Sequence, residues 1–366
     1  MYALFRPLLF HLQAERAHRL GIWAGRLGQT FASPFIASYF TFDDIRLRQS
    51  LWGLNFPNPI GLAAGFDKNA RLIRLWQALG FGFAEIGSVS ARKAKGNKRP
   101  RAFRLPEDYA LINRMGLNND GAAKIEKRVR RAMRGGTLPL GINLAKTHHS
   151  AITGKAALGD FCDSFRLLAP LAGYITLNIS CPNTGDGKTF EDPNALDDLL
   201  RAIFAEQAQM DHNVPVLVKL SPPVSDRVVF DSLIDELLNV SIAHGVAGFV
   251  ASNTASDRLR LNTSAKRLAA IGVGGISGAP IETRATQLVR YIYTKTRGDL
   301  PIIGVGGVAS AESAYSKIRA GASLVQLYTG LIYEGPGLIT QIKKGLVDII
   351  ERDGLARITD AVGLDT

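Results

Sequence analysis

The residues best suited to chemistry in this sequence are two lysines and five asparagines that lie at or near the ends of short apolar runs. They are Lys68, Asn113, Asn143, Asn178, Asn183, Lys219 and Asn253. An asparagine amide offers two N–H donors and a carbonyl acceptor, so such a set can bind a small ring bearing amide, carbonyl and carboxylate groups. A single asparagine at a strand end is usually a turn or cap residue. Several that converge on one site favour a binding role.

Two glycine-containing turns point to a bound phosphate. Gly304-Val305-Gly306-Gly307 and Tyr328-Thr329-Gly330 end the seventh and eighth apolar runs of the chain. Glycine lets backbone N–H groups approach an anion closely, and Thr329 can add a hydroxyl donor. One such turn is a weak signal. Two are more specific, because parallel barrels often bind phosphate in the loops after strands seven and eight.

These residues must be positioned by a regular alternation of short apolar runs and helical segments. The expected strands are 59–64, 83–87, 138–144, 173–179, 214–220, 246–252, 300–305 and 322–328. The expected helices are 69–80, 120–134, 155–172, 194–210, 226–244, 280–297, 310–320 and 336–352. Continuous apolar strands are typical of parallel sheets covered on both faces, and this alternation predicts a (β/α)8 barrel. A doubly wound sheet is the alternative, but its Gly-x-Gly-x-x-Gly turn after the first strand is absent.

The chain divides into two parts. Residues 1–42 are the expected N-terminal membrane and quinone-access segment. Within it, residues 1–28 mix apolar and basic side chains, a pattern typical either of two amphipathic helices lying in a membrane interface or of a helix pair packed on the main domain. They contain neither a membrane-spanning apolar stretch nor the unbroken apolar core of a signal peptide. Residues 43–366 are the expected barrel domain, in which 43–56 form a hairpin that closes the barrel floor. Two insertions, 88–118 and 253–278, leave the C-terminal ends of strands, where loops commonly cover a ligand.

Composition and charge restrict the classes of function. The chain has 366 residues, and 44 basic against 32 acidic residues give a net charge of +12, which suits an anionic partner such as phosphate, a carboxylate substrate or lipid headgroups. Nucleic-acid binding is not favoured, because the basic clusters at 92–101 and 124–134 lack interleaved aromatic residues or a known reader motif. The six histidines are scattered without metal-ligand spacing, so no metal site is expected. Two cysteines exclude a disulfide scaffold.

Seven motifs follow one another along nearly the whole chain. They are Ala64-Gly65-Phe66-Asp67-Lys68, Ile112-Asn113-Arg114-Met115-Gly116, residues 178–184, Ser252-Asn253-Thr254, Gly275-Ile276-Ser277-Gly278, residues 304–307 and residues 321–328. Together they resemble the motifs of the dihydroorotate dehydrogenase family. Glu15-Arg16-Ala17-His18 resembles the start of its membrane-associated, quinone-reducing class. The resemblance implies an FMN-containing barrel that oxidises dihydroorotate to orotate in pyrimidine synthesis and passes electrons to a quinone.

The resemblance also implies roles for individual residues. FMN contacts would come from Ala64, Gly65, Phe66, Asp67, Lys68, Ser88, Asn143, Asn178, Lys219, Ser252, Gly278, Gly307, Tyr328 and Thr329. Substrate contacts would come from Lys68, Asn113, Arg114, Met115, Gly116, Leu117, Asn178, Asn183, Asn253 and Thr254. The quinone path would pass His18, Arg104 and Tyr328. Reduction adds negative charge to the N1/O2 side of the flavin, and Lys219 is a suitable cation to neutralise it.

Cys181 occupies the position where this family places its catalytic base. The flavin N5 would accept a hydride from C6 of the substrate while the base removes the proton at C5. Quinone-reducing members usually have serine at this position, and cysteine is typical of the soluble classes. Because the unperturbed pKa of a thiol, about 8.5, is far below that of a hydroxyl, we expect proton abstraction to titrate nearer neutral pH. The second cysteine, Cys162, is expected to be a core residue.

Other departures keep alternative functions open. Residues 185–193 differ from the Pro-Gly-Leu-Arg pattern usual for the class, and Ser88 and Ser252 replace threonines. One alternative is a soluble-type dihydroorotate dehydrogenase that uses fumarate or NAD. Another is a non-catalytic barrel that binds anions or lipid. We favour a peripheral enzyme with anionic lipid as a partner. No transit segment precedes Met1-Tyr2, so we expect the cytoplasmic face of a bacterial inner membrane. The oligomeric state is left open, with a monomer as one option.

Overall fold

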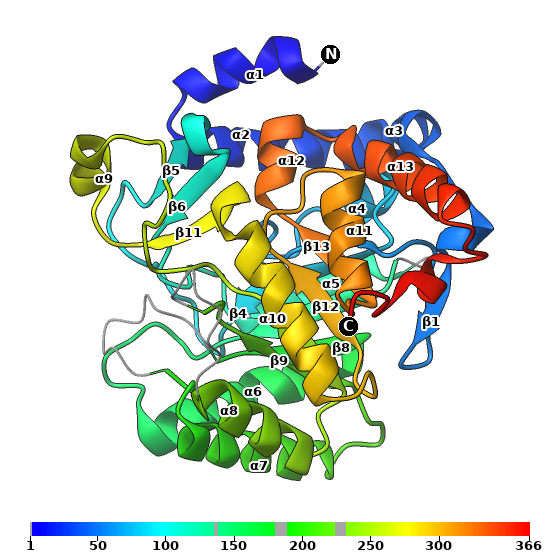
Figure 1. The fold of residues 1–366 in the computed structure, drawn as a ribbon. Helices are drawn as coiled ribbons and strands as arrows, with labels where there is room; N and C mark the ends of the chain where they lie inside the picture. Colours follow the sequence, from blue (N-terminus) through cyan, green and yellow to red (C-terminus); the bar gives the residue numbers. More distant parts are fainter. Residues whose placement is uncertain (1, 135–137, 180–188, 224–231) are drawn as a thin grey trace.

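The centre of the molecule, seen here in a computed structural model, is a closed barrel of eight parallel strands (Figure 1). The structure describes residues 2–134, 138–179, 189–223 and 232–366. Around the barrel the strands are β10 (Gly248–Ala251), β12 (Ile302–Val305), β13 (Leu324–Leu327), β3 (Ile60–Leu62), β4 (Phe83–Val89), β7 (Leu140–Leu144), β8 (Tyr174–Asn178) and β9 (Val216–Leu220). Each predicted apolar run overlaps one of these strands, and only β4 extends past its run, to Val89. The (β/α)8 prediction is therefore confirmed.

Helices cover the outside of the barrel (Figure 1). They are α4 (Ile73–Ala78), α5 (Ala122–Ala132), α6 (Gly154–Leu168), α7 (Pro193–Gln207), α8 (Ser232–Ala243), α10 (Glu282–Lys295), α11 (Ala311–Arg319), α12 (Thr329–Glu334) and α13 (Leu338–Arg352). Their boundaries follow from local chemistry. At the start of α7, Asp192 accepts a hydrogen bond from the backbone N–H of Ala195, and Pro193 stands in the first turn, where its missing N–H costs nothing.

A hairpin closes the N-terminal end of the barrel. It consists of β1 (Gln49–Leu51) and β2 (Leu54–Phe56), which pair antiparallel. Between them, the Trp52 indole N–H donates to the carbonyl of Ala247 at 2.9 Å. The buried ring of Phe56 packs edge-to-face on Phe83 at 5.5 Å. The predicted floor hairpin is therefore confirmed.

The two insertions meet at the opposite end of the barrel in a second, three-stranded sheet that the sequence did not predict. β5 (Ala102–Leu105) and β6 (Ala110–Asn113) come from the first insertion, and β11 (Gly275–Gly278) comes from the second. β6 lies in the middle and pairs antiparallel with both neighbours. A short helix, α9 (Ala265–Ile271), precedes β11. Because both insertions follow the C-terminal ends of barrel strands, this roof sheet lies over the end where active sites form in this fold.

The N-terminal extension has three helices, so the prediction of a two-helix segment needs correction. They are α1 (Tyr2–His11), α2 (Ala14–Phe31) and α3 (Ser33–Phe40). Pro34 explains the third helix, because proline cannot continue α2 but fits the first turn of a new helix. The segment is attached to the barrel domain through α12, where the hydroxyl of Tyr2 donates to the carbonyl of Ile332 at 2.6 Å.

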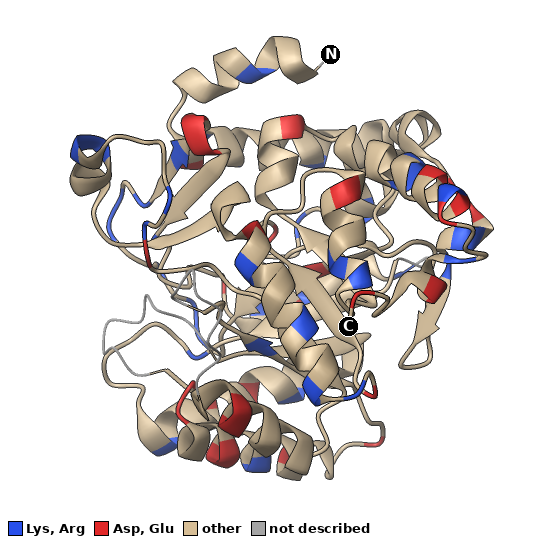
Figure 2. Ribbon diagram, in the orientation of Figure 1, with Lys and Arg blue, Asp and Glu red and all other residues tan. Residues whose placement is uncertain are grey.

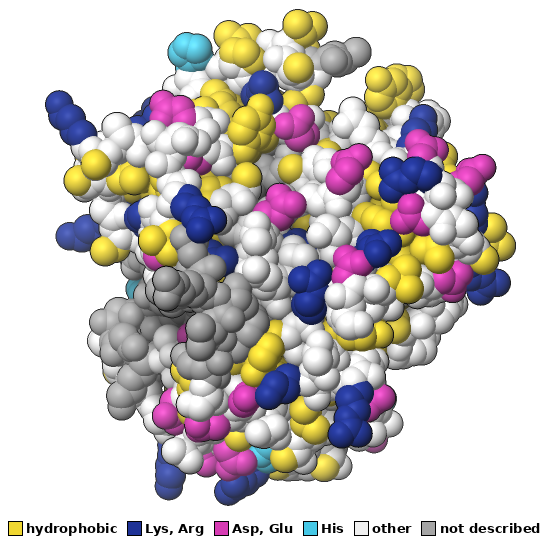
Figure 3. Space-filling view, in the orientation of Figure 1, with side chains coloured by type: hydrophobic (Ala, Val, Ile, Leu, Met, Phe, Trp, Pro, Cys, Tyr) yellow, Lys and Arg dark blue, Asp and Glu magenta, His cyan; other side chains and the backbone are white. Residues whose placement is uncertain are grey.

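Large apolar side chains on these three helices, and one in the turn between α1 and α2, face outward. This N-terminal apolar surface consists of Leu4, Phe5, Leu8, Leu12, Leu20, Trp23, Leu27, Phe31, Phe35 and Tyr39. Figure 3 shows hydrophobic side chains gathered over α1. Lys and Arg lie on these helices, as Arg6 does on α1, and on other elements that include α9, α10 and α13 (Figure 2). In the described part of the chain, no helix has the length and apolar character needed to span a bilayer.

Candidate active site

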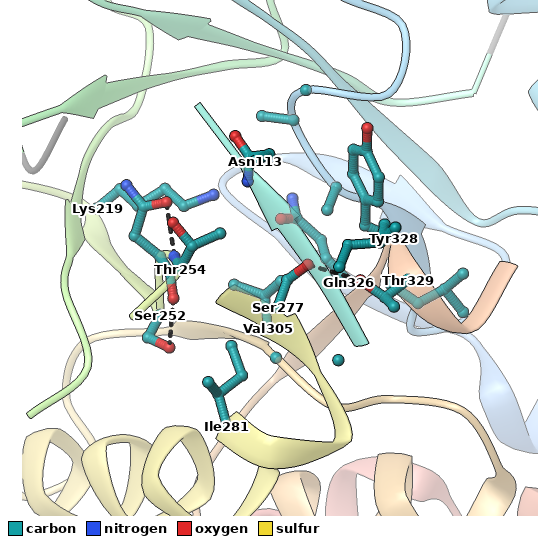
Figure 4. Close-up of a pocket in the computed structure, with 18 of the residues that line it drawn as sticks. Asn113, Lys219, Ser252, Thr254, Ser277, Ile281, Val305, Gln326, Tyr328 and Thr329 are labelled. Carbon is teal, nitrogen blue, oxygen red and sulfur yellow. Dashed lines mark hydrogen bonds between the residues drawn. The ribbon is translucent and has the colours of Figure 1, made fainter. Parts of the chain in front are cut away.

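A cavity lies between the C-terminal ends of the barrel strands and the roof sheet (Figure 4). Most of the predicted site residues line it, namely Ala64, Gly65, Lys68, Ser88, Asn113, Met115, Gly116, Leu117, Asn143, Asn178, Lys219, Ser252, Asn253, Thr254, Gly278, Gly307, Tyr328 and Thr329. They lie on the barrel strands, in the turns that follow them, and in both insertions. Figure 4 shows Lys219, Ser252 and Thr254 on one side and Tyr328 and Thr329 on the other. The fold therefore brings together residues up to 265 positions apart, from Ala64 to Thr329.

Three predicted residues direct their side chains elsewhere. The buried Asp67 carboxylate accepts backbone N–H groups of Arg71 at 2.8 Å and Leu72 at 2.7 Å, and burial raises the pKa of this carboxyl. It fixes the turn before α4. The Arg114 guanidinium donates to the carbonyl of Val273 at 2.9 Å. It also stacks over a roof-sheet side chain, that of Phe103, at 4.7 Å.

The third of these, Phe66, belongs to an aromatic row between α2 and the cavity. Its ring contacts His18 at 5.0 Å and Tyr328 at 5.1 Å, both edge-to-face. Burial and the charge of nearby Lys68 lower the pKa of His18 to about 4, so its imidazole is neutral at pH 7. Burial raises the pKa of Tyr328 to about 12, so its phenol keeps its proton. Cys181 and Asn183 lie outside the described residues.

One end of the cavity is built from glycines and hydroxyls. Gly306, Gly307, Gly278 and Thr329 all line it. Gly307 has a φ of +79°, and a Cβ at this position would lie 2.6 Å from the Cα of Glu282. Only glycine fits there, because a larger residue would meet Glu282 at the start of α10. The hydroxyls of Thr329 and Ser277 lie 2.9 Å apart. Ser277 was not among the predicted site residues, although the Gly-Ile-Ser-Gly motif contains it.

The strand side of the cavity contains a buried cation above a buried carboxylate. Lys219 on β9 is buried, and burial lowers the pKa of its ammonium while the charge of Glu85 opposes that shift. Glu85 on β4 is fully buried, and Asn143 donates to it at 2.9 Å. Sequence reasoning missed Glu85. The available signal was its position as the only charged residue in the apolar run 83–87.

Arg104 connects the roof sheet to the N-terminal helices. Its guanidinium donates to the carbonyl of Leu9 at 3.0 Å and to that of Leu12. It also stacks over the ring of Phe10 at 4.6 Å. Burial lowers the pKa of this guanidinium. Arg104 thus holds the end of α1 and the turn into α2 against β5.

A second connection is a buried ion pair at the start of α2. The Arg101 guanidinium donates to the Glu15 carboxylate at 2.9 Å, and both side chains are less than 10% exposed. The more exposed Arg99 contacts the same carboxylate at 3.0 Å. Burial opposes ionisation of Glu15, but the two arginines hold its pKa below the usual value. Arg101 also donates to the carbonyl of Asn97, so the pair ties α2 to the segment that leads into the roof sheet.

Removing Glu15 is expected to destabilise the protein. Glu15→Ala leaves the buried Arg101 without its carboxylate, which typically costs about 3–5 kcal/mol, measurable by denaturant unfolding. Arg99→Ala is the matched control. The Arg99 side chain is 56% exposed, so its loss should cost less than about 1 kcal/mol. Equal effects of the two substitutions would contradict a structural role for the buried pair.

Within residues 2–134, 138–179, 189–223 and 232–366, no group of three or more His, Cys, Asp or Glu side chains could hold a metal ion. The cavity instead presents amides, hydroxyls, glycine backbone and lysines. That donor set matches an anionic, nitrogen-rich ligand.

Comparison with known proteins agrees with this geometry. The family model for dihydroorotate dehydrogenase matches residues 46–350. The chain belongs to the dihydroorotate dehydrogenase family. It is therefore an oxidoreductase, and the resemblance inferred from its motifs is confirmed.

Full-length relatives carry the same family name. A dihydroorotate dehydrogenase (quinone) of Nocardia farcinica is 41% identical and aligns over 100% of this chain and 97% of the relative. One of Natronomonas pharaonis is 43% identical over 100% of this chain and 99% of the relative. The crystal structure of ligand-free dihydroorotate dehydrogenase from Eimeria tenella superimposes with a TM-score of 0.81 at 30% identity, over 93% of this chain and 98% of that one.

Proposed function

We propose that this dihydroorotate dehydrogenase oxidises dihydroorotate to orotate with bound FMN and delivers the electrons to a quinone at a membrane surface. The observation that carries the proposal is the cavity itself. At the C-terminal end of the barrel, its lining combines a glycine-rich end, a buried lysine and the side-chain amides of several asparagines. Quinone-reducing relatives match the chain from end to end, the N-terminal helices included.

The residues of the cavity fit FMN. Gly278, Gly307 and Thr329 would hold its phosphate through backbone N–H groups and a hydroxyl. Lys219 would lie at the ring edge that gains negative charge, and its burial strengthens that electrostatic interaction. Gln326 also lines the cavity, and its buried Oε1, which has no hydrogen-bond partner among the described residues, can accept from a ring N–H. When bound, FMN supplies a hydride acceptor and an electron store.

The remaining polar residues fit the substrate. Lys68, Asn113, Asn253 and Thr254 line the cavity. A lysine ammonium would bind the carboxylate of dihydroorotate, and the amides would bind its ring N–H and carbonyl groups. The neighbouring backbone orients the side chain of Asn253, because its Oδ1 accepts a hydrogen bond from the backbone N–H of Thr254 at 2.8 Å. Such pre-organisation lets the site hold the ring in one orientation.

Cys181 would act as the base that removes the proton from C5 of the substrate. It follows β8 by three residues in the sequence, and Asn178, the last residue of that strand, lines the cavity. A thiolate is the reactive form of cysteine, and a thiol ionises far more readily than a serine hydroxyl. The base would remove the hydrogen on C5 as a proton, whereas the hydrogen on C6 leaves as hydride.

The N-terminal helices would form the access route for the quinone and the contact with the membrane. The N-terminal apolar surface, with Phe5 57% and Trp23 59% exposed, is suited to an interfacial position, and the net charge of +12 favours anionic lipid. His18, Arg104 and Tyr328 would lie along the path inward. We place the enzyme as a peripheral protein on the cytoplasmic face of a bacterial inner membrane.

The proposal predicts a yellow protein with a defined acceptor preference. The purified chain should show FMN absorbance that bleaches on anaerobic addition of dihydroorotate. Colour should return with a short-chain ubiquinone or menaquinone analogue, and much more slowly with fumarate or NAD. Reoxidation by fumarate or NAD alone would contradict the quinone assignment and favour a soluble-type enzyme. A colourless protein that cannot be loaded with FMN would contradict the proposed function itself.

A further inference from the structure

The fully buried carboxylate of Glu85 accepts hydrogen bonds from four side chains. One oxygen accepts from Nδ2 of Asn143 at 2.9 Å. The other accepts from Nε2 of Gln326 at 2.8 Å and from the hydroxyls of Tyr174 and Thr176, both at 3.2 Å. An ionised carboxylate can only accept hydrogen bonds. Both amides must therefore turn their NH2 groups toward Glu85.

The orientation of Asn143 fixes the next groups toward the cavity. Because its Nδ2 is used on Glu85, its Oδ1 faces Ser88 and accepts the proton of the Ser88 hydroxyl. That hydroxyl has only one proton to give, so it must accept where it meets Asn178. Nδ2 of Asn178 donates to it at 3.0 Å. The hydrogen-bond directions are thus set one after another, starting from the carboxylate.

The same logic extends to the predicted substrate residues. With its Nδ2 used on Ser88, Asn178 offers Oδ1, which accepts from Nδ2 of Asn253 at 3.2 Å. Asn253 in turn accepts from the backbone N–H of Thr254 at 2.8 Å. The chain from Glu85 to Thr254 therefore runs in one direction from the centre of the barrel to the cavity mouth.

We infer that Glu85 is a positioning residue that sets the direction of the hydrogen bonds from Asn143 to Asn178 along the strand side of the cavity. It does so without lining the cavity, by fixing the inner end of this row of hydrogen bonds, while the backbone N–H of Thr254 fixes the outer end at Asn253. The inference rests on the proposed function, because the cavity is taken to hold FMN and orotate. Its effect on FMN would pass through Gln326, whose Oε1 is buried without a partner in the described structure and lines the cavity. Figure 4 shows Gln326 and Lys219 among the lining side chains.

Glu85→Gln tests the inference, since glutamine can donate as well as accept. Asn143 could then flip and present its Nδ2 to Ser88, where it would compete with the donor from Asn178 and disturb the row of amides that leads to the cavity. We expect orotate affinity, measured by the perturbation of flavin absorbance, to fall about tenfold or more, the size of a lost charge-assisted hydrogen bond. The visible spectrum of bound FMN should also shift. Unchanged orotate affinity and an unchanged spectrum would overturn the inference.

Thr176→Val is the matched control, because it removes one donor to the same carboxylate and leaves every other donor and acceptor role intact. Orotate affinity should stay within about twofold of the parent value, as for a redundant neutral hydrogen bond. A loss as large as that of Glu85→Gln would show that any damage to this buried cluster suffices, and would overturn the inference.

A double variant that moves the buried negative charge to a neighbouring position tests the inference even if the single variant folds poorly. In the double variant Glu85→Gln with Asn143→Asp, the carboxylate moves to position 143. There it accepts from the amide at position 85 and from the hydroxyl of Ser88, so the direction of the hydrogen bonds above position 143 is restored. Recovery of yellow protein with most of the parental orotate affinity would support the inference. A double variant as impaired as the single one would overturn it. Failure of the parent protein to bind FMN would instead count against the proposed function.

Discussion

Replacing Cys181 with alanine is expected to slow dihydroorotate oxidation about 10²- to 10⁴-fold, the usual loss when a positioned general base is removed. Orotate affinity should change little, because Lys68, Asn113 and Asn253 line the cavity independently of this side chain. The measurement is anaerobic stopped flow, following the bleaching of flavin absorbance after mixing with dihydroorotate. A decrease of less than about threefold would be too small for a general base and would remove Cys181 from the mechanism.

The pH dependence of the same step separates thiol from hydroxyl chemistry. In the parent enzyme the rate should rise with pH and level off as the thiol ionises, near or below its unperturbed pKa of about 8.5. Cys181→Ser should be slower at pH 7 and should continue to accelerate where the parent enzyme has levelled off. Identical profiles would contradict a catalytic thiolate. Cys162→Ala is the control, because Cys162 lies on α6 and burial raises the pKa of its thiol.

Deleting residues 1–40 is expected to reduce quinone turnover by about 10²-fold or more, the scale on which loss of positioning acts. The deletion also removes Glu15 and so lowers stability, but oxidation of dihydroorotate with a water-soluble dye as acceptor should persist at temperatures below the unfolding transition of the shortened protein. The deletion removes His18 from the aromatic row beside Phe66. It also takes away the three groups that contact Arg104, namely the carbonyls of Leu9 and Leu12 and the ring of Phe10. Quinone and dye reduction should be assayed side by side, together with sedimentation on vesicles of anionic lipid.

Point variants separate membrane contact from quinone access. Phe5→Ser with Leu8→Ser alters two side chains that are 57% and 68% exposed, so the fold should persist while vesicle binding weakens. Arg104→Ala should release α1 from β5 and lower quinone reduction without affecting dye reduction. Undiminished quinone turnover in the deleted protein would mean that the N-terminal helices are not the access route.

The barrel could be predicted from the sequence because its strands are continuous runs of apolar residues. A strand such as Val216–Leu220 is buried on both faces, so its sequence carries a signal that needs no tertiary context. The third N-terminal helix and the roof sheet lacked such a signal. β11 pairs with β6 from a segment more than 160 residues away, and a pairing of that separation is not encoded in local pattern.

The candidate site was predictable to the extent that its residues share motifs. Motif position correctly grouped residues that line one cavity, but it could not tell side-chain direction. Asp67 lies inside such a motif, yet its carboxylate binds the backbone of the following turn. Glu85 presents the opposite case. It lies in a strand that the sequence marks as purely structural, and only the three-dimensional contacts reveal how many polar groups depend on it.

The roof sheet has a consequence for engineering this enzyme. Its three strands exchange main-chain hydrogen bonds between two distant insertions, with β6 shared by both partners. Arg114 adds a side-chain connection across the same boundary. A chimaera that received only one of these insertions from another species would bring in a strand whose neighbour had not changed with it. Grafts intended to alter ligand preference should therefore transfer both segments together.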